Sequence, residues 1–451
     1  MSSSLHSFFQ EKCPANLLVR NLHTLAVRTL GAAVMKRTDV KASDTTESVE
    51  LPSGLRARFY LSAAAVPEDV WNGLVRNEQL FLRHDYLRIT EETASADLSF
   101  IYVLLYDGKK AAAALYFQVV HLSAELLAEI LAPLAAAKPI PGIGGNWSDW
   151  LIRCREECGM RLLISGNNFV SGEYGIAIRS DIDREQAFSA MAEVVKHITK
   201  TSVEPIKISA VLVKDYYQAA AKDGFFRLKK HRYHSFQVEP EMIVPLRDEW
   251  KTFDDYIAAM AKKYRTRTRS VMNKTAMLET QELDAAETEQ LLPELYSLYL
   301  QVYNKARFKL TRLEASYFLE MKRAFPDSFR ITVYRLNGRI VAFRSLFHLP
   351  ASANKKAALE AHFIGLDYSV SSELHLYQRL LYDFVADGIA ANAEKIFLGR
   401  TAPEIKSTVG AVAHELVCCI RHRNGLSNQI IRPFIDYLKP SPWVQRNPFQ
   451  K

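Results

Sequence analysis

The stretch FRITVYRLNGRIVAFRSLF, residues 329–347, decides the fold expected for this chain. Two runs of strand-forming residues flank Asn337-Gly338, and an Asn-Gly pair suits a tight hairpin turn because both central residues adopt positive φ. The stretch LSFIYVLLYDGKKAAAALYFQVV, residues 98–120, has the same form around Asp107-Gly108. The sequence therefore predicts one β-hairpin in each half of the chain.

The same order of elements follows each hairpin. After the first we expect a strand, a helix and two further strands, at residues 161–164, 186–198, 206–211 and 233–238. After the second, the corresponding elements are expected at residues 359–366, 374–385, 395–398 and 415–421. This recurrence predicts a duplicated α/β fold in which each half is a mixed sheet flanked by helices.

Length and composition indicate a globular protein with more than one domain. A chain of 451 residues is longer than one hydrophobic core usually serves, and 48% hydrophobic with 24% charged residues is an ordinary globular composition. We expect an N-terminal amphipathic helix with a polar linker, a first α/β domain, a second α/β domain that carries the catalytic site, and a basic, aromatic tail, at residues 1–50, 51–245, 246–430 and 431–451.

Charge and cysteine usage limit the partners and the compartment. The net charge of +8 favours an anionic partner: a phosphate-rich cofactor, a nucleic acid or an acidic membrane surface. An odd number of cysteines without a secretion signal predicts a reducing cytoplasm. Cys154 and Cys158 lack a second ligand pair, so no metal site is expected. No apolar run reaches the roughly 18 residues of a membrane-spanning helix.

The segment at residues 15–36 carries a helical apolar stripe beside basic residues. It has two interpretations: a helix lying on the anionic inner face of the cell membrane, or a helix docked on the protein's own core. The tail at residues 431–451 also mixes apolar, aromatic and basic residues. The expected location is the cytoplasm, with peripheral membrane contact as an open alternative.

Two motifs, Lys263-Tyr264-Arg265 and LGRTAPEIKSTVGA at residues 398–411, resemble signatures of the FemAB-like and BioF2-like acyltransferase group of the GNAT superfamily. Lys263-Tyr264-Arg265 follows an amphipathic helix and is similar to the K-x-R signature of that group. The stretch LGRTAPEIKSTVGA, residues 398–411, resembles its terminal motif, in which G-R is followed by K and then by G-A. The resemblance covers about residues 55–425 and is most specific over about 250–420. It implies two tandem GNAT-like domains that transfer an acyl group to an amine.

The chain departs from the relatives in two places. The loop at residues 367–374 lacks the glycines with which GNAT enzymes hold the pyrophosphate of acetyl-CoA. The chain also lacks the sustained heptads of the coiled-coil arm that Fem-type enzymes use with aminoacyl-tRNA. The missing glycines argue against the usual docking of CoA at this loop, and the missing heptads make tRNA the less favoured donor. From the resemblance, the expected donor is acyl-CoA or acyl carrier protein as a co-substrate, with no permanently bound cofactor.

The catalytic candidates lie on and just after the strand expected at residues 359–366. Strand alternation places Glu360 and His362 on one face, where a carboxylate can orient an imidazole or accept the proton itself. The alternative is a polar couple that pairs with itself or faces solvent. Asp367 and Tyr368 follow the strand and are candidates for contacting the amine and protonating the leaving group.

The binding candidates are mostly cationic. Arg344 lies in an apolar strand, so it must pair with Glu360 on the neighbouring strand or meet an anionic group of a substrate. From the resemblance, Arg400, Lys406 and Gly410 are expected to bind an anionic ligand. Tyr264 and Arg265 belong to a basic cluster at 262–274 that binds donor, tRNA or lipid phosphates, or is a solvated helix face.

Three functions are compatible with these residues. The first is direct acyl transfer from a thioester to a primary amine, such as an amino acid, an amino sugar or an amino-lipid of the cell envelope. The second is aminoacyl-tRNA-dependent modification of peptidoglycan, and the third is a non-catalytic pair of GNAT domains that binds RNA or a membrane. Because the first half lacks counterparts of Glu360, His362 and the 398–411 motif, we expect it to be structural.

Overall fold

The computed structural model describes residues 45–123, 160–201, 208–218, 228, 231–306, 310–351, 356–431, 435–436 and 439–449. The helix expected at 15–36, most of the linker that follows it, and Cys154 with Cys158 lie outside the described residues. The chain from Thr45 to Lys451 forms one compact unit.

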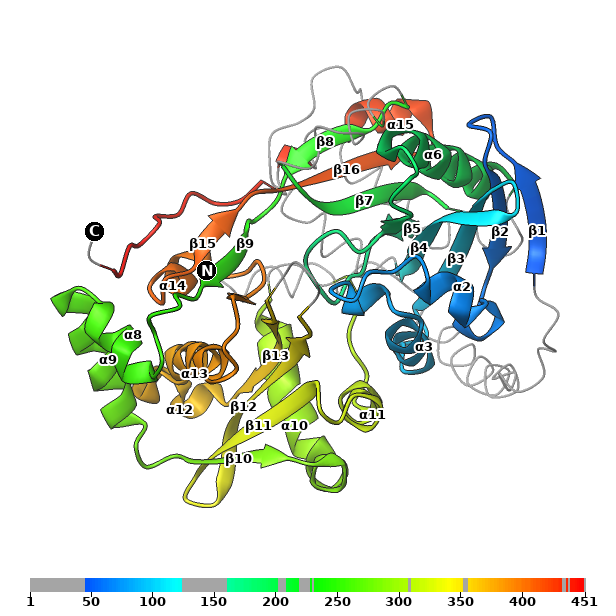
Figure 1. Ribbon diagram of the computed structural model, residues 1–451. Coiled ribbons are helices and arrows are strands. Elements are labelled where there is room, and N and C mark those ends of the chain that lie inside the picture. The colour runs from blue at the N-terminus through cyan, green and yellow to red at the C-terminus, as the bar shows by residue number, and fades with distance from the viewer. Residues whose placement is uncertain are drawn as a thin grey trace, which may run out of the picture. The chain divides into compact units, whose positions relative to one another are not determined.

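Nine strands of the described residues form the first sheet, in the order β1-β2-β3-β4-β5-β7-β16-β8, with β6 paired to β4 (Figure 1). Within it β5 and β7 are parallel, and the other pairs are antiparallel. The strands are β1 (Thr45–Glu50), β2 (Arg56–Tyr60), β3 (Leu98–Asp107), β4 (Lys110–Leu122), β5 (Met160–Ser165), β6 (Ile176–Ile178), β7 (Ala210–Tyr217), β8 (His234–Gln237) and β16 (Leu416–His422).

Seven strands of the described residues form the second sheet, in the order β10-β11-β12-β13-β14-β9-β15. Its one parallel pair in this part of the chain is β13 with β14. The strands are β9 (Glu241–Pro245), β10 (Glu279–Leu283), β11 (Phe329–Leu336), β12 (Arg339–Leu349), β13 (Ala358–Leu366), β14 (Lys395–Phe397) and β15 (Val412–His414). The predicted α/β class with two mixed sheets is confirmed.

Both predicted hairpins are present, but their turns differ. Asn337 and Gly338 have φ of 51° and 78°, as the Asn-Gly turn between β11 and β12 requires. In the first hairpin Asp107 is the last residue of β3, and Gly108, with φ of 57°, supplies the positive angle. The turn with two positive φ values that Asp107-Gly108 predicts is therefore wrong, because Gly108 alone has a positive φ between β3 and β4.

The two sheets exchange strands. β16, from the end of the chain, lies in the first sheet between β7 and β8, and β9 lies in the second sheet between β14 and β15 (Figure 1). The strand expected at 415–421 therefore completes the first sheet rather than the second. Two domains divided at residue 245 remain a proposal, because the first sheet takes strands from both sides of this position.

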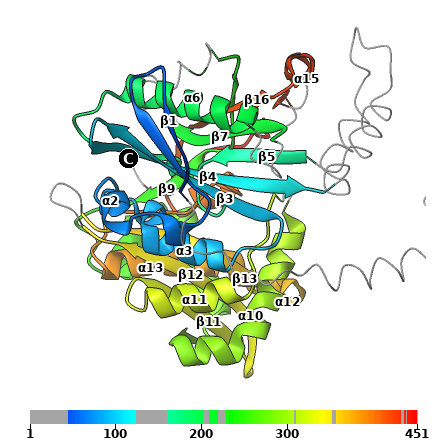
Figure 2. The same cartoon turned by 90° about the vertical axis from the view of Figure 1, so that its right-hand side faces the viewer.

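Helices cover the faces of both sheets. They are η1 (Ala63–Ala65), α2 (Glu68–Asn72), η2 (Leu80–Leu82), α3 (His84–Glu92), α6 (Arg184–Thr201), α8 (Phe253–Ala259), α9 (Lys262–Lys274), α10 (Ala285–Lys305), α11 (Ser316–Ala324), α12 (Tyr368–Leu374), α13 (Leu376–Ala390), α14 (Pro403–Ser407) and α15 (Gly425–Ile430). Figure 2 shows α10 and α11 beside β11 to β13, and α6 along the first sheet. In the part of the chain that is described, no helix combines the length and apolar character needed to span a bilayer.

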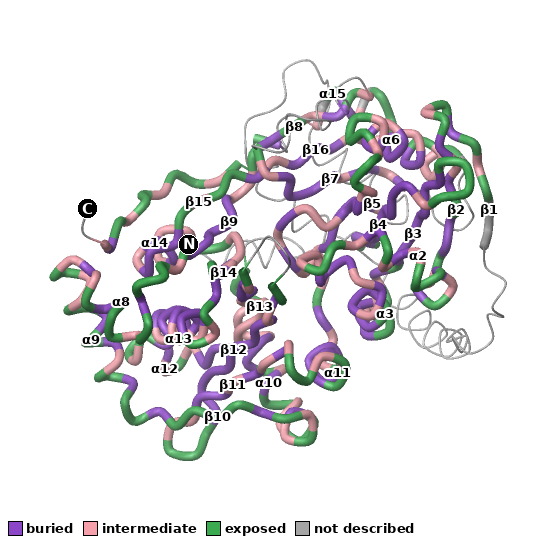
Figure 3. The backbone as a smooth tube through the Cα atoms, in the orientation of Figure 1, coloured by how far each residue is buried: buried purple, intermediate pink, exposed green. Residues whose placement is uncertain are grey.

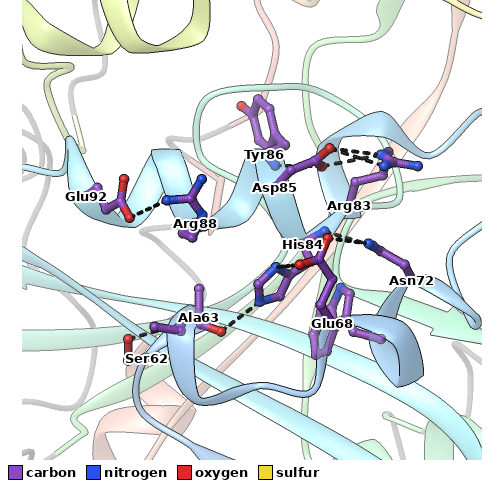
Figure 4. Close-up of polar contacts among 12 residues, drawn as sticks. Ser62, Ala63, Glu68, Asn72, Arg83, His84, Asp85, Tyr86, Arg88 and Glu92 are labelled. Atoms are coloured by element: carbon purple, nitrogen blue, oxygen red, sulfur yellow. Dashed lines mark hydrogen bonds and ion pairs between the residues drawn. The ribbon is translucent and has the colours of Figure 1, made fainter. Parts of the chain in front are cut away.

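One core of buried apolar side chains is common to both sheets. It contains Tyr86 of α3 and Tyr102 of β3 as well as Tyr317 of α11 and Phe347 of β12. Figure 3 shows that β12 is buried along most of its length, whereas buried and half-buried residues are mixed along β11. The N-terminal end of α3 is fixed on this core by the buried ring of His84, whose Nε2 lies 2.8 Å from the carbonyl oxygen of Ala63 (Figure 4).

Close packing around Gly365 of β13 leaves no room for a side chain at this position. A Cβ at this position would meet the ring of Phe343 and lie 2.7 Å from Leu298 Cβ. We expect Gly365→Ala to lower the free energy of unfolding by about 1–3 kcal/mol, since overpacking forces neighbouring side chains to move. Urea denaturation measures this, with Gly425→Ala as the control because a Cβ at Gly425 meets nothing within 4 Å. Equal stability of the two variants would contradict this account.

Candidate active site

The strands β13 and β14 form a fork in the second sheet. They pair at Ala358↔Lys395, Leu359↔Ile396 and Glu360↔Phe397, and the pairing ends there. The chain after β14 follows β9 instead, because the Leu398 N–H donates to the Met242 carbonyl at 2.8 Å. Within the described residues, β13 therefore continues from Glu360 to Leu366 without a strand on its β14 side. Such an edge offers backbone N–H groups to a ligand.

Glu360 lies at the point where the fork opens. It is 3% exposed, and among the described residues it forms no hydrogen bond or ion pair. Burial, together with the charge of Glu241, raises the pKa of the Glu360 carboxyl well above its ordinary value, and Lys406 opposes this shift. A buried carboxyl without a partner is suited to accept a proton from a bound substrate.

Lys406 of α14 is the cation at the same place. It is 4% exposed, and its side chain likewise forms no hydrogen bond or ion pair with any described residue. Burial lowers the pKa of its ammonium group to about 7, against the opposing charges of Glu239, Glu241 and Glu360. The backbone turns at Ala402, whose φ is 56°, and Pro403 then begins α14. The structure thus brings Glu360 and Lys406 within electrostatic reach of each other.

His362 is oriented by Tyr317 rather than by Glu360. Its Nε2 lies 2.7 Å from the Tyr317 hydroxyl, which in turn lies 3.0 Å from the Tyr86 hydroxyl. Burial lowers the pKa of the imidazole to about 3, so the ring is neutral at physiological pH. No hydrogen bond joins Glu360 to His362 in the described structure. The predicted orientation of the imidazole by Glu360 is therefore wrong.

Arg400 is bound within the protein. Its Nη1 lies 2.8 Å from Asp215 Oδ1, and Lys214 Nζ lies 2.5 Å from Asp215 Oδ2. Asp215 is fully buried and has a φ of 60°, which is uncommon for a residue with a side chain. The family-like motif predicts that Arg400 binds an anionic ligand. In the structure Asp215 of the first sheet is its partner.

The corresponding fork of the first sheet is filled. β5 and β7 are parallel up to Ser165↔Val213, and Gly166 follows with a φ of 131°. A Cβ on Gly166 would lie 2.6 Å from Lys214 Cγ, and Lys214 Nζ donates to the Asn167 carbonyl at 2.7 Å. The side chain of Lys214 therefore occupies this place. The observation supports the expectation that the first half is structural.

Arg344 belongs to a buried network behind β12. It forms an ion pair with Asp387 of α13 and donates from Nε to the Tyr334 hydroxyl at 2.7 Å. Among the described residues, Arg344 forms no hydrogen bond or ion pair with Glu360, and Asp387 takes the place that a substrate anion was predicted to occupy. The predicted pairing of Arg344 with Glu360 is wrong, because the nearest carboxylate comes from the helix packed on that face of the sheet.

Asp367 and Tyr368 have structural partners as well. Asp367 caps α12 by accepting from the Ser369 N–H at 2.9 Å, and its other oxygen lies 2.9 Å from Arg339 Nη1. The ring of Tyr368 lies 3.3 Å from Lys305 Nζ. The carboxylate of Asp367 therefore serves as the N-cap of α12.

The remaining candidates face other parts of the protein. Arg265 donates to the carbonyl oxygen of Ala258 at 3.2 Å and so caps the end of α8, while Tyr264 packs on the core of the second sheet. Gly410 lies against Phe449 of the tail, whose Cζ would be 2.9 Å from an added Cβ. No hydrogen bond or ion pair of the described residues links Tyr264, Arg265 or Gly410 to Glu360.

Comparisons with known proteins give structural matches only. No protein-family model and no curated protein matches this sequence. Among solved structures, the chain is similar to FemX, with 10% identity, a TM-score of 0.49, and coverage of 81% of this chain and 98% of that chain. It is also similar to a tandem GNAT protein from the clavulanic acid biosynthesis pathway (8% identity, TM-score 0.44, 82% and 99% coverage).

A third similar structure is the C-terminal domain of a putative lysylphosphatidylglycerol synthetase from Agrobacterium fabrum (10% identity, TM-score 0.42, 82% and 95% coverage).

Proposed function

We propose that the chain is an N-acyltransferase that moves an acyl group from a thioester, carried by CoA or by acyl carrier protein, to a primary amine by direct attack. The observation that carries the proposal is the placement of Glu360 and Lys406. Both side chains are buried without a hydrogen bond or ion pair in the described structure. Glu360 is the last residue of β13 that pairs with β14, and the charge of Lys406 acts on it. The motifs at residues 263–265 and 398–411 connect this arrangement to acyl transfer.

Each proton in the reaction has a residue to hold it. The substrate ammonium gives a proton to Glu360, and the raised pKa of this carboxyl makes that transfer less unfavourable. The amine nitrogen then attacks the thioester carbonyl, and backbone N–H groups of β13 beyond Glu360 stabilise the oxyanion. The carbon–sulfur bond breaks, and the departing thiolate takes a proton from the Lys406 ammonium. The nitrogen, which still carries two hydrogens and a positive charge after the attack, gives one proton to the neutral Lys406 amine, and Glu360 returns its proton to solvent. The products are an amide and a free thiol.

The proposal is tested with the purified chain, a panel of acyl-CoA and acyl carrier protein thioesters, and primary amines that include amino sugars and amino-lipids. We expect thiol release that depends on the amine and equals the amide formed, which mass spectrometry quantifies. Absence of thiol release with every pair would refute the proposal.

Transfer from aminoacyl-tRNA is the second candidate, because α9 exposes cations that no described carboxylate neutralises. Lys262, Lys263 and Arg269 are exposed on this helix. If α9 holds RNA phosphates, Lys262→Ala with Lys263→Ala should reduce the slope of log affinity for tRNA against log salt by roughly 1–2. Filter binding at several salt concentrations measures this slope. An unchanged slope leaves α9 as a solvated surface.

The pH dependence of the rate follows from Lys406. Its pKa of about 7 means that the ammonium loses its proton as the pH rises through neutrality, so protonation of the thiolate fails and the rate falls. The raised pKa of Glu360 places the acid limb above the ordinary carboxylate range. We expect Lys406→Met to remove the alkaline limb of kcat against pH and to lower kcat. An alkaline limb that survives in Lys406→Met would exclude Lys406 as the proton donor.

A further inference from the structure

A second buried carboxylate lies on the exchanged strand β9. Glu241 is 1% exposed, and its Oε2 accepts a hydrogen bond from the Tyr217 hydroxyl of β7. Its Oε1 is buried without a hydrogen-bond partner in the described residues. An unsatisfied buried carboxylate oxygen costs free energy unless a hydrogen-bond donor or a cation binds it. We therefore expect this oxygen to bind a group from outside the chain.

The strand registers place Glu241 and Glu360 on the same face of the second sheet. Glu360 is in register with Phe397 of β14, and Phe397 is in register with Ile243 of β9. Residues in register point to the same face, and Glu241 precedes Ile243 by two positions, so its side chain points that way too. Their backbones lie two strands and two residues apart, which amounts to about 12 Å for the usual strand spacing and rise. Their side chains interact electrostatically.

The cations nearby leave both carboxylates without an ion pair. Lys214 and Arg400 are held by Asp215, and Lys406 makes no ion pair although the charges of Glu239, Glu241 and Glu360 act on it. Two buried acids and one buried amine, none of which forms an ion pair with a described residue, interact electrostatically at this site. A small cation arriving there gains the attraction of both carboxylates in a region of low dielectric constant.

We infer that Glu241 and Glu360 together form the subsite for the acceptor ammonium, and that the acceptor is a primary amine without a neighbouring carboxylate. The inference rests on the proposed function and narrows its substrate class. An amino acid would bring its carboxylate close to Glu239, Glu241 and Glu360, and like charges in a buried site oppose binding strongly. Tyr217 is a positioning residue, because its hydrogen bond holds Oε2 and leaves Oε1 for the amine.

Binding of the amine should release protons. Burial raises the pKa of Glu241 to about 7, and the charges acting on it come from Asp215 and Lys214 of β7, from Arg400 and from Glu360. A bound ammonium favours the ionised form of both carboxyls, so part of the protein population loses a proton on binding near neutral pH. This release does not depend on any acyl donor.

The test is isothermal titration calorimetry of the whole chain with 2-phenylethylamine and with phenylalanine, which differ only in the carboxylate. Each titration is run in two buffers of different ionisation enthalpy, so that the difference in heat gives the protons released. We expect 2-phenylethylamine to bind with proton release and phenylalanine to bind at least about tenfold more weakly. Equal affinity for the two compounds would overturn the inference.

Variants locate the subsite. Glu241→Gln should weaken 2-phenylethylamine by at least about tenfold and reduce the proton release, while Glu373→Gln, on the exposed end of α12, should leave both unchanged. Tyr217→Phe is a second variant that keeps the carboxylate, and we expect it to weaken binding by roughly threefold or more. Affinities equal to that of the unchanged protein in both Glu241→Gln and Tyr217→Phe would overturn the inference.

The two proposals fail in different ways. Amine binding with proton release but without acyl transfer would refute the proposed function and leave the subsite standing. Acyl transfer that Glu241→Gln leaves unchanged in rate and in amine affinity would refute the subsite and leave the transferase.

Discussion

Replacing Glu360 by Gln is expected to slow amide formation by about 10²–10⁴-fold, the range in which a positioned general base contributes. The amide of glutamine has nearly the same size as the carboxyl, so packing at the fork is conserved while the proton acceptor is lost. Because Glu360 forms no hydrogen bond or ion pair with other described residues, the substitution breaks no internal contact.

The measurement is single-turnover formation of amide with saturating thioester and amine. Glu373→Gln serves as the matched control, since this glutamate is exposed on α12. Affinity for the thioester should be conserved in Glu360→Gln, which separates loss of chemistry from loss of binding. A rate within about twofold of the unchanged protein would remove Glu360 from the mechanism.

Replacing Asp387 by Ala is expected to lower the free energy of unfolding by about 3–5 kcal/mol. Arg344 is buried, and Asp387 is the carboxylate that it contacts. Without Asp387 the guanidinium keeps the hydrogen bond to Tyr334 and the ring of Phe384, 5.2 Å away, but it loses its ion-pair partner in a buried place. Denaturant unfolding monitored by circular dichroism gives the difference.

The double variant Arg344→Met with Asp387→Leu is the informative control. Apolar residues of similar volume often replace a buried ion pair at little cost, so we expect the double variant to recover most of the lost stability. A loss below about 1 kcal/mol in Asp387→Ala would mean that Arg344 reaches solvent or another anion.

The fold was accessible from the sequence because its signals are local. Asn337-Gly338 fixes a turn by the angles of two residues, and alternating apolar residues around it fix the strands. The exchange of β9 and β16 between the two sheets could not be predicted from the sequence. The segment LVCCIRH at 416–422 has the propensity of a strand, but propensity does not state which sheet the strand joins.

The candidate site was accessible in part. Glu360 was found because a carboxylate in an apolar strand requires a reason, and Lys406 was found through a family-like motif. Arg344 gave the same kind of signal, yet its partner Asp387 lies 43 residues away on a helix, and sequence spacing cannot identify such a pair. Lys214 and Asp215 are also charged residues in an apolar strand, AVLVKDYY, and this pattern indicates a buried ion pair in the same way.

The most direct test of the account is a crystal structure of the chain with a thioether ketone analogue of an acyl-CoA, in which a methylene stands between sulfur and carbonyl. The account predicts the carbonyl oxygen against the β13 edge beyond Glu360 and the sulfur on the side of Lys406. An analogue bound elsewhere, for instance along α9 or at the fork of the first sheet, would contradict it.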